Sequence, residues 1–174
     1  MPANDLRAVA PVIATLSRRA LVLSATAAFG LTTLPGLARA QAATSAVMAA
    51  DEAYMKALAD EITLIDIRTP EEWAQTGVPD GALALDMTKQ ESFLEALVAL
   101  RAADAAKPIA LICRTGNRSG FIVKALAKQG FPGLVDVAEG IAGGPRGKGW
   151  LPRGLPTYAG TPEEVETRRT KLLP

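Results

Sequence analysis

The sequence predicts an α/β fold, in which a mostly parallel sheet is flanked by helices. Short apolar runs alternate along the chain with longer amphipathic segments, which is typical of strands joined by crossover helices. Two of the short runs, 61–68 and 108–113, are rich in isoleucine and leucine and indicate buried strands. Glycine and proline stand between the segments, where the chain has to turn.

The first half of this pattern supplies four expected elements. Residues 46–60 carry apolar side chains at helical spacing and predict a helix. The strand at 61–68 is expected to end near Asp66. The stretch TPEEWAQTG, residues 69–77, has a threonine cap, a proline in the first turn and a glutamate three residues after the cap, so it predicts a short helix opened by a capping box. A turn and a short strand over 82–85 follow.

The second half alternates in the same way and ends in a loop and a tail. Apolar residues at helical spacing alternate there with short branched runs, until glycine and proline become frequent. We expect a helix over 88–104, a strand over 108–113, a helix over 119–129, a strand over 133–140, a long loop over 140–157 and a terminal helix within 161–174.

The beginning of the chain has the composition of an export signal. Residues 1–40 contain the adjacent pair Arg18 and Arg19, then an apolar run, then a small-x-small sequence that ends at Ala40. This order predicts cleavage after Ala40, and the paired arginines resemble a twin-arginine (Tat) signal, which implies a periplasmic destination in a bacterium. An uncleaved membrane anchor stays open as the alternative. The expected parts are an export signal at 1–40, a domain at 41–160 and a helical tail at 161–174.

Composition excludes several classes of site and partner. The 174 residues include no histidine and one cysteine, so catalysis by a Cys-His or Ser-His pair, a disulfide within the chain and a thiolate zinc cluster are excluded. Residues 1–40 hold four of the 19 basic and one of the 18 acidic side chains. The remaining 15 basic and 17 acidic side chains give a net charge of −2, which argues against a nucleic acid or, after cleavage, a membrane as partner. We expect no metal and no cofactor.

The only cysteine, Cys113, lies where chemistry is expected in an open parallel sheet. It ends a predicted strand and precedes a predicted helix, whose N-terminus favours negative charge, so the nucleophilic thiolate is favoured there. Gly116 and Asn117 suit a tightly curled loop, and Arg114 and Arg118 are cations suited to an oxyanion. A lone cysteine at a strand end is often a buried apolar residue, but these neighbours favour a reactive thiol held in an anion-binding loop.

The combination of these motifs resembles the rhodanese family of sulfurtransferases in its single-domain form. The resemblance covers about residues 61–157 and rests on LIDIRTPEEW, TGVPDGA, CRTGNRS and GW…GLPT, of which CRTGNRS is the most specific. It implies the family's three-layer fold. It also implies transfer of sulfane sulfur from thiosulfate or a persulfide donor to a thiol or cyanide acceptor, through a persulfide on Cys113. The expected partners are therefore a small anionic sulfur donor and a thiol acceptor, which could be a protein thiol.

The resemblance also implies a role for each residue around the cysteine. Arg114 and Arg118 would hold the anionic donor, and Asp66 would hydrogen-bond and shape the loop. Arg68 is expected to pair with Glu71 or Glu72 as part of the scaffold. The anion-binding residues expected from the resemblance are Arg114, Thr115, Gly116, Asn117, Arg118 and Ser119.

Two other classes of function stay open. Phosphatases that use a cysteine in a phosphate-binding loop place an arginine six positions after it, whereas this chain has Ser119 there and Arg118 one position earlier. The shorter loop suits sulfur better than a phosphoryl group. A non-catalytic binding module on the same scaffold is the second alternative, and a redox sensor is its variant, which would need an external thiol because the chain has no second cysteine.

Overall fold

The structure, a computed structural model, describes residues 46–172. The expected export signal, 1–40, lies outside the described residues. The strands are β1 (Ala46–Met48), β2 (Thr63–Asp66), β3 (Val78–Pro79), β4 (Ala82–Ala84), β5 (Ile109–Ile112), β6 (Leu134–Val137) and β7 (Thr157–Tyr158). The helices are α2 (Ala50–Leu58), α3 (Pro70–Thr76), α4 (Gln90–Ala103), α5 (Asn117–Lys128), the 3-10 helix η2 (Leu151–Arg153) and α6 (Pro162–Leu172).

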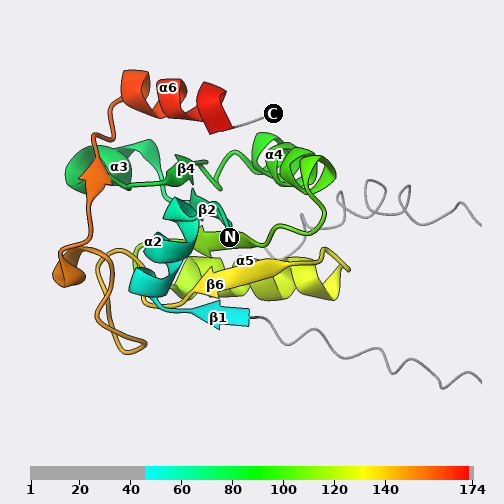
Figure 1. Ribbon diagram of the computed structural model, residues 1–174, viewed down its shortest axis with the longest axis horizontal. Helices are drawn as coiled ribbons and strands as arrows, with labels where there is room; N and C mark the ends of the chain where they lie inside the picture. Colours follow the sequence, from blue (N-terminus) through cyan, green and yellow to red (C-terminus); the bar gives the residue numbers. More distant parts are fainter. Residues whose placement is uncertain (1–45, 173–174) are drawn as a thin grey trace, which may run out of the picture. The chain divides into compact units, whose positions relative to one another are not determined.

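Five parallel strands form the central sheet, in the order β1-β6-β5-β2-β4. β3 and β7 form a separate antiparallel pair. Figure 1 shows the five strands stacked from β1 at the bottom to β4 near the top, with α2 in front of the sheet and α5 behind it. The predicted α/β class with a mostly parallel sheet and flanking helices is confirmed.

Each face of the sheet buries its own apolar cluster. Alternate strand residues point to opposite faces, so Ile65 and Leu111 lie in one cluster and Leu64 and Ile112 in the other. The first cluster is completed by α4 and α5, and the second by α2 and by buried aromatic side chains such as Trp150. Because both faces are covered, the parallel strands are apolar on both sides, which explains why they appear in the sequence as continuous apolar runs.

The predicted helix over 46–60 is wrong at its beginning. Residues 46–48 form β1, which pairs in parallel with β6, and the helix begins only at Ala50. Val47, expected on a helix face, lies in this edge strand with 67% of its surface exposed. Pairing with β6 stabilises this strand, because without β1 the backbone N–H and C=O groups along the edge of β6 would have no partners in the sheet.

The short helix α3 agrees with its sequence signature. It begins after Thr69 with proline in the first turn and ends at Gly77, and Glu72 Oε2 accepts a hydrogen bond from Thr69 N at 3.2 Å. The predicted capping box is confirmed. It fixes the start of α3 close to the end of β2, so that Glu72 is held in a defined direction.

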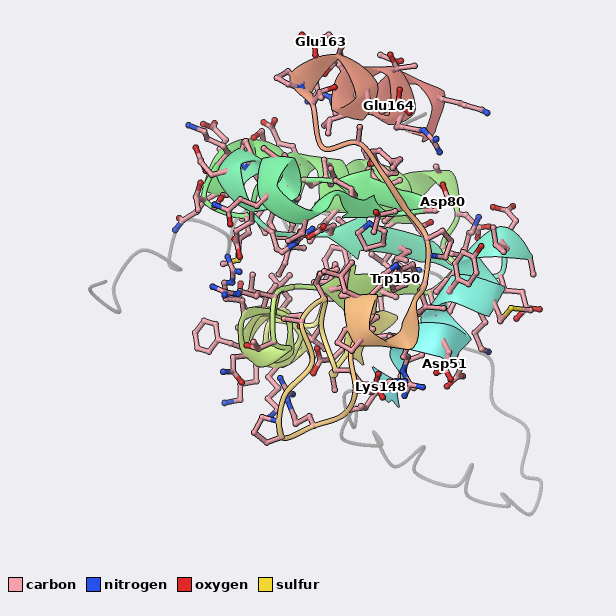
Figure 2. All side chains as sticks on the ribbon, turned by 90° about the vertical axis from the view of Figure 1, so that its left-hand side faces the viewer. Asp51, Asp80, Lys148, Trp150, Glu163 and Glu164 are labelled. Atoms are coloured by element: carbon pink, nitrogen blue, oxygen red, sulfur yellow. The ribbon has the colours of Figure 1, made fainter. Side chains whose placement is uncertain are left out.

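The last part of the chain closes the fold around the sheet. The glycine-rich segment, residues 140–157, runs from the end of β6 to β7, with Trp150 fully buried and Lys148 at the surface (Figure 2). α6 contacts β4, which is an edge strand, and Arg168 of α6 lies over the Tyr158 ring at 4.6 Å. Within residues 46–172 we find no helix with the length and apolar character needed to cross a bilayer.

Candidate active site

The register of the sheet brings the ends of β2 and β5 together. Asp66, the last residue of β2, is paired with Ile112, and Cys113 follows directly at the carboxyl end of β5. α5 begins four residues later, after Gly116. The residues from Cys113 to Ser119, which we call the cysteine loop, therefore lie at the edge of a parallel sheet where ligands bind in this class of fold.

The thiol of Cys113 is buried, and it has both apolar neighbours and hydrogen-bond donors around it. The residue is 1% exposed, which by itself fits a buried apolar cysteine as well as a reactive one. Its Sγ accepts a hydrogen bond from the backbone N–H of Ser119 at 3.4 Å and lies 3.5 Å from the Ser119 hydroxyl. Such donors stabilise a thiolate more than a thiol, because only the thiolate carries a negative charge on sulfur.

Several backbone N–H groups of the cysteine loop have no partner among the described residues. Gly116 takes a left-handed conformation with φ of 79° and lets the chain curl into α5. Among the described residues, no acceptor pairs with the N–H groups of residues 115–118, whereas Gly120 N bonds to Gly116 O at 3.1 Å. Free N–H groups at a helix N-terminus form an anion-binding concavity. The cysteine loop can therefore stabilise negative charge on Sγ or on a bound oxyanion.

The segment after β6 fixes the cysteine loop from the side of the sheet. Ile141 N donates to Cys113 O at 2.9 Å, and Ala142 N donates to Arg114 O at 2.8 Å. A Cβ on Gly116 would overlap the carbonyl oxygen of Ala138, so the two backbones are in direct contact. The cysteine loop is thus braced by main-chain contacts on one side and by α5 on the other.

Arg118 is bound by a carboxylate that the sequence did not assign to it. Its guanidinium donates to Glu72 Oε2 at 2.7 Å and to Glu72 Oε1 at 2.5 Å, which is a bidentate pair between α5 and α3. The hydrogen bond from Arg118 holds the pKa of Glu72 below its ordinary value, and Glu72 raises the pKa of Arg118. The positive charge of Arg118 is therefore largely compensated before any substrate binds.

The expected partner of Arg68 is wrong. Arg68 pairs with Asp66, through Nε to Oδ1 at 2.9 Å and Nη2 to Oδ2 at 2.6 Å. Glu72 accepts a hydrogen bond from Arg68 only through its backbone oxygen, because the Glu72 carboxylate is turned toward Arg118. Burial raises the pKa of Asp66, and the hydrogen bonds and charge of Arg68 oppose that shift.

Asp66 and Arg68 influence the cysteine loop indirectly, through helix α3. Among the described residues, the hydrogen bonds of the Asp66 carboxylate go to Arg68 and none goes to the cysteine loop. Arg68 also donates to Thr76 Oγ1 and to Gly77 O, both at 2.7 Å. The pair therefore holds the end of α3, the helix that presents Glu72 to Arg118.

The remaining expected site residues differ in exposure, and the exposed ones mark the mouth of the cysteine loop. Arg114 and Asn117 are exposed and Thr115 is half-buried, while Ser119 is buried against Cys113. Sequence reasoning missed one further pair, Arg146 with the buried Asp136, at 3.0 Å. The signal for it was a glycine inside a helix: a Cβ on Gly120 would lie 2.9 Å from Asp136 Oδ2 and 3.2 Å from Arg146 Nη1.

Comparisons with known proteins find a matching family model and similar chains. The family model described as the rhodanese-like domain matches residues 50–144. A protein of Allochromatium vinosum named sulfurtransferase is 33% identical over 112 residues, which cover 62% of this chain and 91% of that protein. An uncharacterised protein of Rickettsia prowazekii is 28% identical over 98 residues, which cover 53% of this chain and 80% of that protein.

Among solved structures, the fold is similar to that of a protein from M. tuberculosis. Its crystal structure matches with a TM-score of 0.50 and 23% sequence identity, over 66% of this chain and 98% of that one. At this level of identity the similarity concerns the fold alone.

Proposed function

Because this chain belongs to the rhodanese family, whose members include sulfurtransferase-like proteins, we propose that it transfers sulfane sulfur through a persulfide on Cys113. The observation that supports this proposal most directly is the environment of Sγ. It accepts a hydrogen bond from Ser119 N and lies in a loop whose N–H groups at residues 115–118 have no partner among the described residues. These groups would stabilise the thiolate before the reaction and the terminal sulfur after it.

The reaction consists of two nucleophilic steps that balance without an oxidant. In the first, the Cys113 thiolate attacks the sulfane sulfur of thiosulfate; an S–S bond forms at Cys113, the bond inside thiosulfate breaks, and sulfite leaves with the electron pair. In the second, cyanide or a thiolate attacks the outer sulfur, and the Cys113 thiolate leaves. Arg114, which is exposed at the loop mouth, would attract the anionic donor.

The covalent intermediate is tested by intact mass. We expect the purified protein to gain one sulfur atom after incubation with thiosulfate, to lose it on addition of cyanide, and to show neither change as Cys113→Ser. Absence of the adduct with thiosulfate and with a persulfide donor would contradict the proposal. It would favour the reading as a binding module on the same scaffold.

We also propose that the protein is exported and cleaved. The support is the sequence alone: paired arginines, an apolar run and a small-x-small site that ends at Ala40. The same mass spectrum, recorded on protein from a periplasmic extract, should give a chain that begins at Gln41. A chain with residues 1–40 intact and recovered with membranes would contradict cleavage and favour the anchor.

A further inference from the structure

The outer face of α5 presents one exposed stripe that starts at the cysteine loop. Phe121, Lys124 and Lys128, which we call the α5 stripe, follow Asn117 at intervals of four, three and four residues, and all are exposed. This spacing keeps them on one face of a helix. The opposite face, which carries the buried Val123, packs against the sheet.

The stripe and the cysteine loop carry uncompensated positive charge. Residues 113–128 contain four arginine or lysine side chains and no aspartate or glutamate. Arg118 is paired with Glu72. The other three, Arg114, Lys124 and Lys128, form no ion pair with any described residue. The full sequence has a net charge of +1, and the chain without residues 1–40 has a net charge of −2, so the positive field around the thiol and along the helix that follows it is local.

Phe121 adds an apolar contact to this charged face. It has 66% of its surface exposed and stands three residues after Arg118 on α5. A single exposed apolar residue is common on protein surfaces and proves nothing alone. An exposed aromatic ring flanked by cations, next to a reactive loop, has the composition that protein interfaces favour at their centres.

We propose that the α5 stripe is the docking surface for an acidic segment of a protein whose thiol exchanges sulfur with Cys113. This inference rests on the proposed sulfurtransferase function. A small dianion has to compete with Glu72 for Arg118, whereas an acidic segment finds unpaired cations at Arg114, Lys124 and Lys128 and an apolar anchor at Phe121. The twelve residues of α5 span about 18 Å, the length of an extended segment of five or six residues.

The exchange itself needs no additional reactant. The partner thiolate attacks the outer sulfur of the Cys113 persulfide, the S–S bond at Cys113 breaks, and the Cys113 thiolate leaves with the electron pair. The partner becomes the persulfide. Docking along the stripe would hold the partner thiol at the loop mouth and so raise its effective concentration.

Binding to synthetic peptides tests the docking surface without any sulfur chemistry. Fluorescence anisotropy would compare three labelled peptides with one cysteine and alternating leucine: one rich in glutamate, one in glutamine and one in lysine. We expect the glutamate peptide to bind about tenfold more tightly than the glutamine peptide, and this advantage to shrink at high salt. Equal binding of the two peptides would overturn the proposal.

Variants locate the binding on α5. We expect Lys124→Glu combined with Lys128→Glu, and separately Phe121→Ser, to weaken binding of the glutamate peptide about tenfold. Lys171→Glu, an exposed lysine on α6, is the matched control and should bind as the unaltered protein does. If Lys171→Glu weakened binding of the glutamate peptide as much as the stripe variants do, the binding would not be located on α5 and the proposal would be overturned. If phosphatidylglycerol vesicles bound to the stripe as tightly as the glutamate peptide does, an acidic protein segment would be overturned as the partner.

Sulfur transfer then separates this inference from the function it rests on. Protein loaded with thiosulfate should pass sulfur to the glutamate peptide faster than to the glutamine peptide, and the stripe variants should lose that preference while they still transfer sulfur to cyanide. If Cys113 never gains sulfur, the proposed function fails while the anisotropy result still stands. If sulfur transfer to cyanide is normal and the stripe variants keep the preference for the glutamate peptide, the docking surface is contradicted while the proposed function stands.

Discussion

Glu72 serves two neighbours at once. Its Oε2 accepts from Thr69 N, which starts α3, and the same carboxylate forms the bidentate pair with Arg118. Because Arg118 holds the pKa of Glu72 below 4.5, the pair remains ionised at neutral pH. A cation expected to bind substrate is thereby occupied by an internal anion.

Removing the charge of Glu72 should improve binding of an anionic donor. Glu72→Gln keeps a side-chain oxygen for Thr69 N but leaves Arg118 uncompensated. We expect KM for thiosulfate to fall about fivefold, which corresponds to about 1 kcal/mol for one charge pair near the surface, with a smaller change in kcat. Steady-state rates at fixed cyanide measure both constants. Glu71→Gln, an exposed neighbour on α3, is the control, and an unchanged or higher KM in Glu72→Gln would contradict the role given to the pair.

The buried pair of Asp66 and Arg68 should matter for stability. Asp66 is fully buried and Arg68 is 1% exposed, so removal of one partner leaves an uncompensated charge inside the protein. We expect Arg68→Ala to lower the free energy of unfolding by about 3–5 kcal/mol. Arg169→Ala, which breaks an exposed pair with Glu166, should cost less than about 1 kcal/mol. Urea denaturation compares the two variants, and similar losses would show that burial does not decide the effect.

Local sequence patterns predict the part of the candidate site whose residues are close together in the chain. Cys113, Gly116 and Ser119 form one loop whose order is visible in seven letters. The pairing of Glu72 with Arg118 joins residues 46 positions apart, and no local pattern predicts such a contact. The predicted partner of Arg68 was wrong because several carboxylates lie within four residues of it in the sequence. Only the packing of the folded chain decides which of them pairs with Arg68.

Among the elements, β1 marks the limit of local signals. The predicted boundaries of α3 agree with the structure because cap, proline and terminal glycine are all encoded within nine residues. β1 has three residues, Ala46–Met48, and no alternation long enough to distinguish it from the first turn of the following helix. It exists because β6 offers an edge, and that edge is assembled from residues about ninety positions later.

The turn between β5 and α5 depends on a glycine that cannot be replaced without moving its neighbour. A Cβ on Gly116 would overlap Ala138 O, and its φ of 79° is unfavourable for other residues. Gly130 has a similar φ of 86° but nothing within 4 Å of such a Cβ, so it separates backbone strain from the clash. We expect Gly130→Ala to cost about 1–2 kcal/mol and Gly116→Ala at least about 3 kcal/mol. Gly116→Ala should also slow persulfide formation, and equal losses of stability in thermal unfolding would contradict the close contact.

For the described molecule as a whole, Glu139 joins elements that are distant in sequence. It follows β6 and accepts hydrogen bonds from Gly149 N at 3.1 Å and from Arg153 Nη2 at 2.6 Å. Arg153 in turn donates to Asp51 of α2 at 3.0 Å. These bonds close the glycine-rich segment against the core, beside the residues that brace the cysteine loop. The segment is therefore fixed by a few polar bonds and by the buried Trp150.

The stability that Glu139 supplies should depend on pH in a defined way. The hydrogen bond from Arg153 lowers the pKa of Glu139 from its ordinary 4.5 in the folded state. A group whose pKa is lowered by folding stabilises the protein fully above its unfolded pKa and loses that contribution as pH falls through the folded value. We expect the unaltered protein to be about 2 kcal/mol more stable than Glu139→Gln at pH 7.

This difference in stability should remain constant from pH 7 to about pH 5 and narrow below pH 4.5. Subtracting the two proteins removes the opposite contribution of Asp66, whose pKa is raised by burial in both. Urea denaturation at several pH values measures the difference, and Glu163→Gln, at the exposed start of α6, should stay within about 0.5 kcal/mol of the unaltered protein at pH 7. The expected narrowing results from protonation of Glu139, which removes its negative charge. A difference in stability that persists unchanged to pH 3 would therefore mean that Glu139 acts through packing and not through its charge.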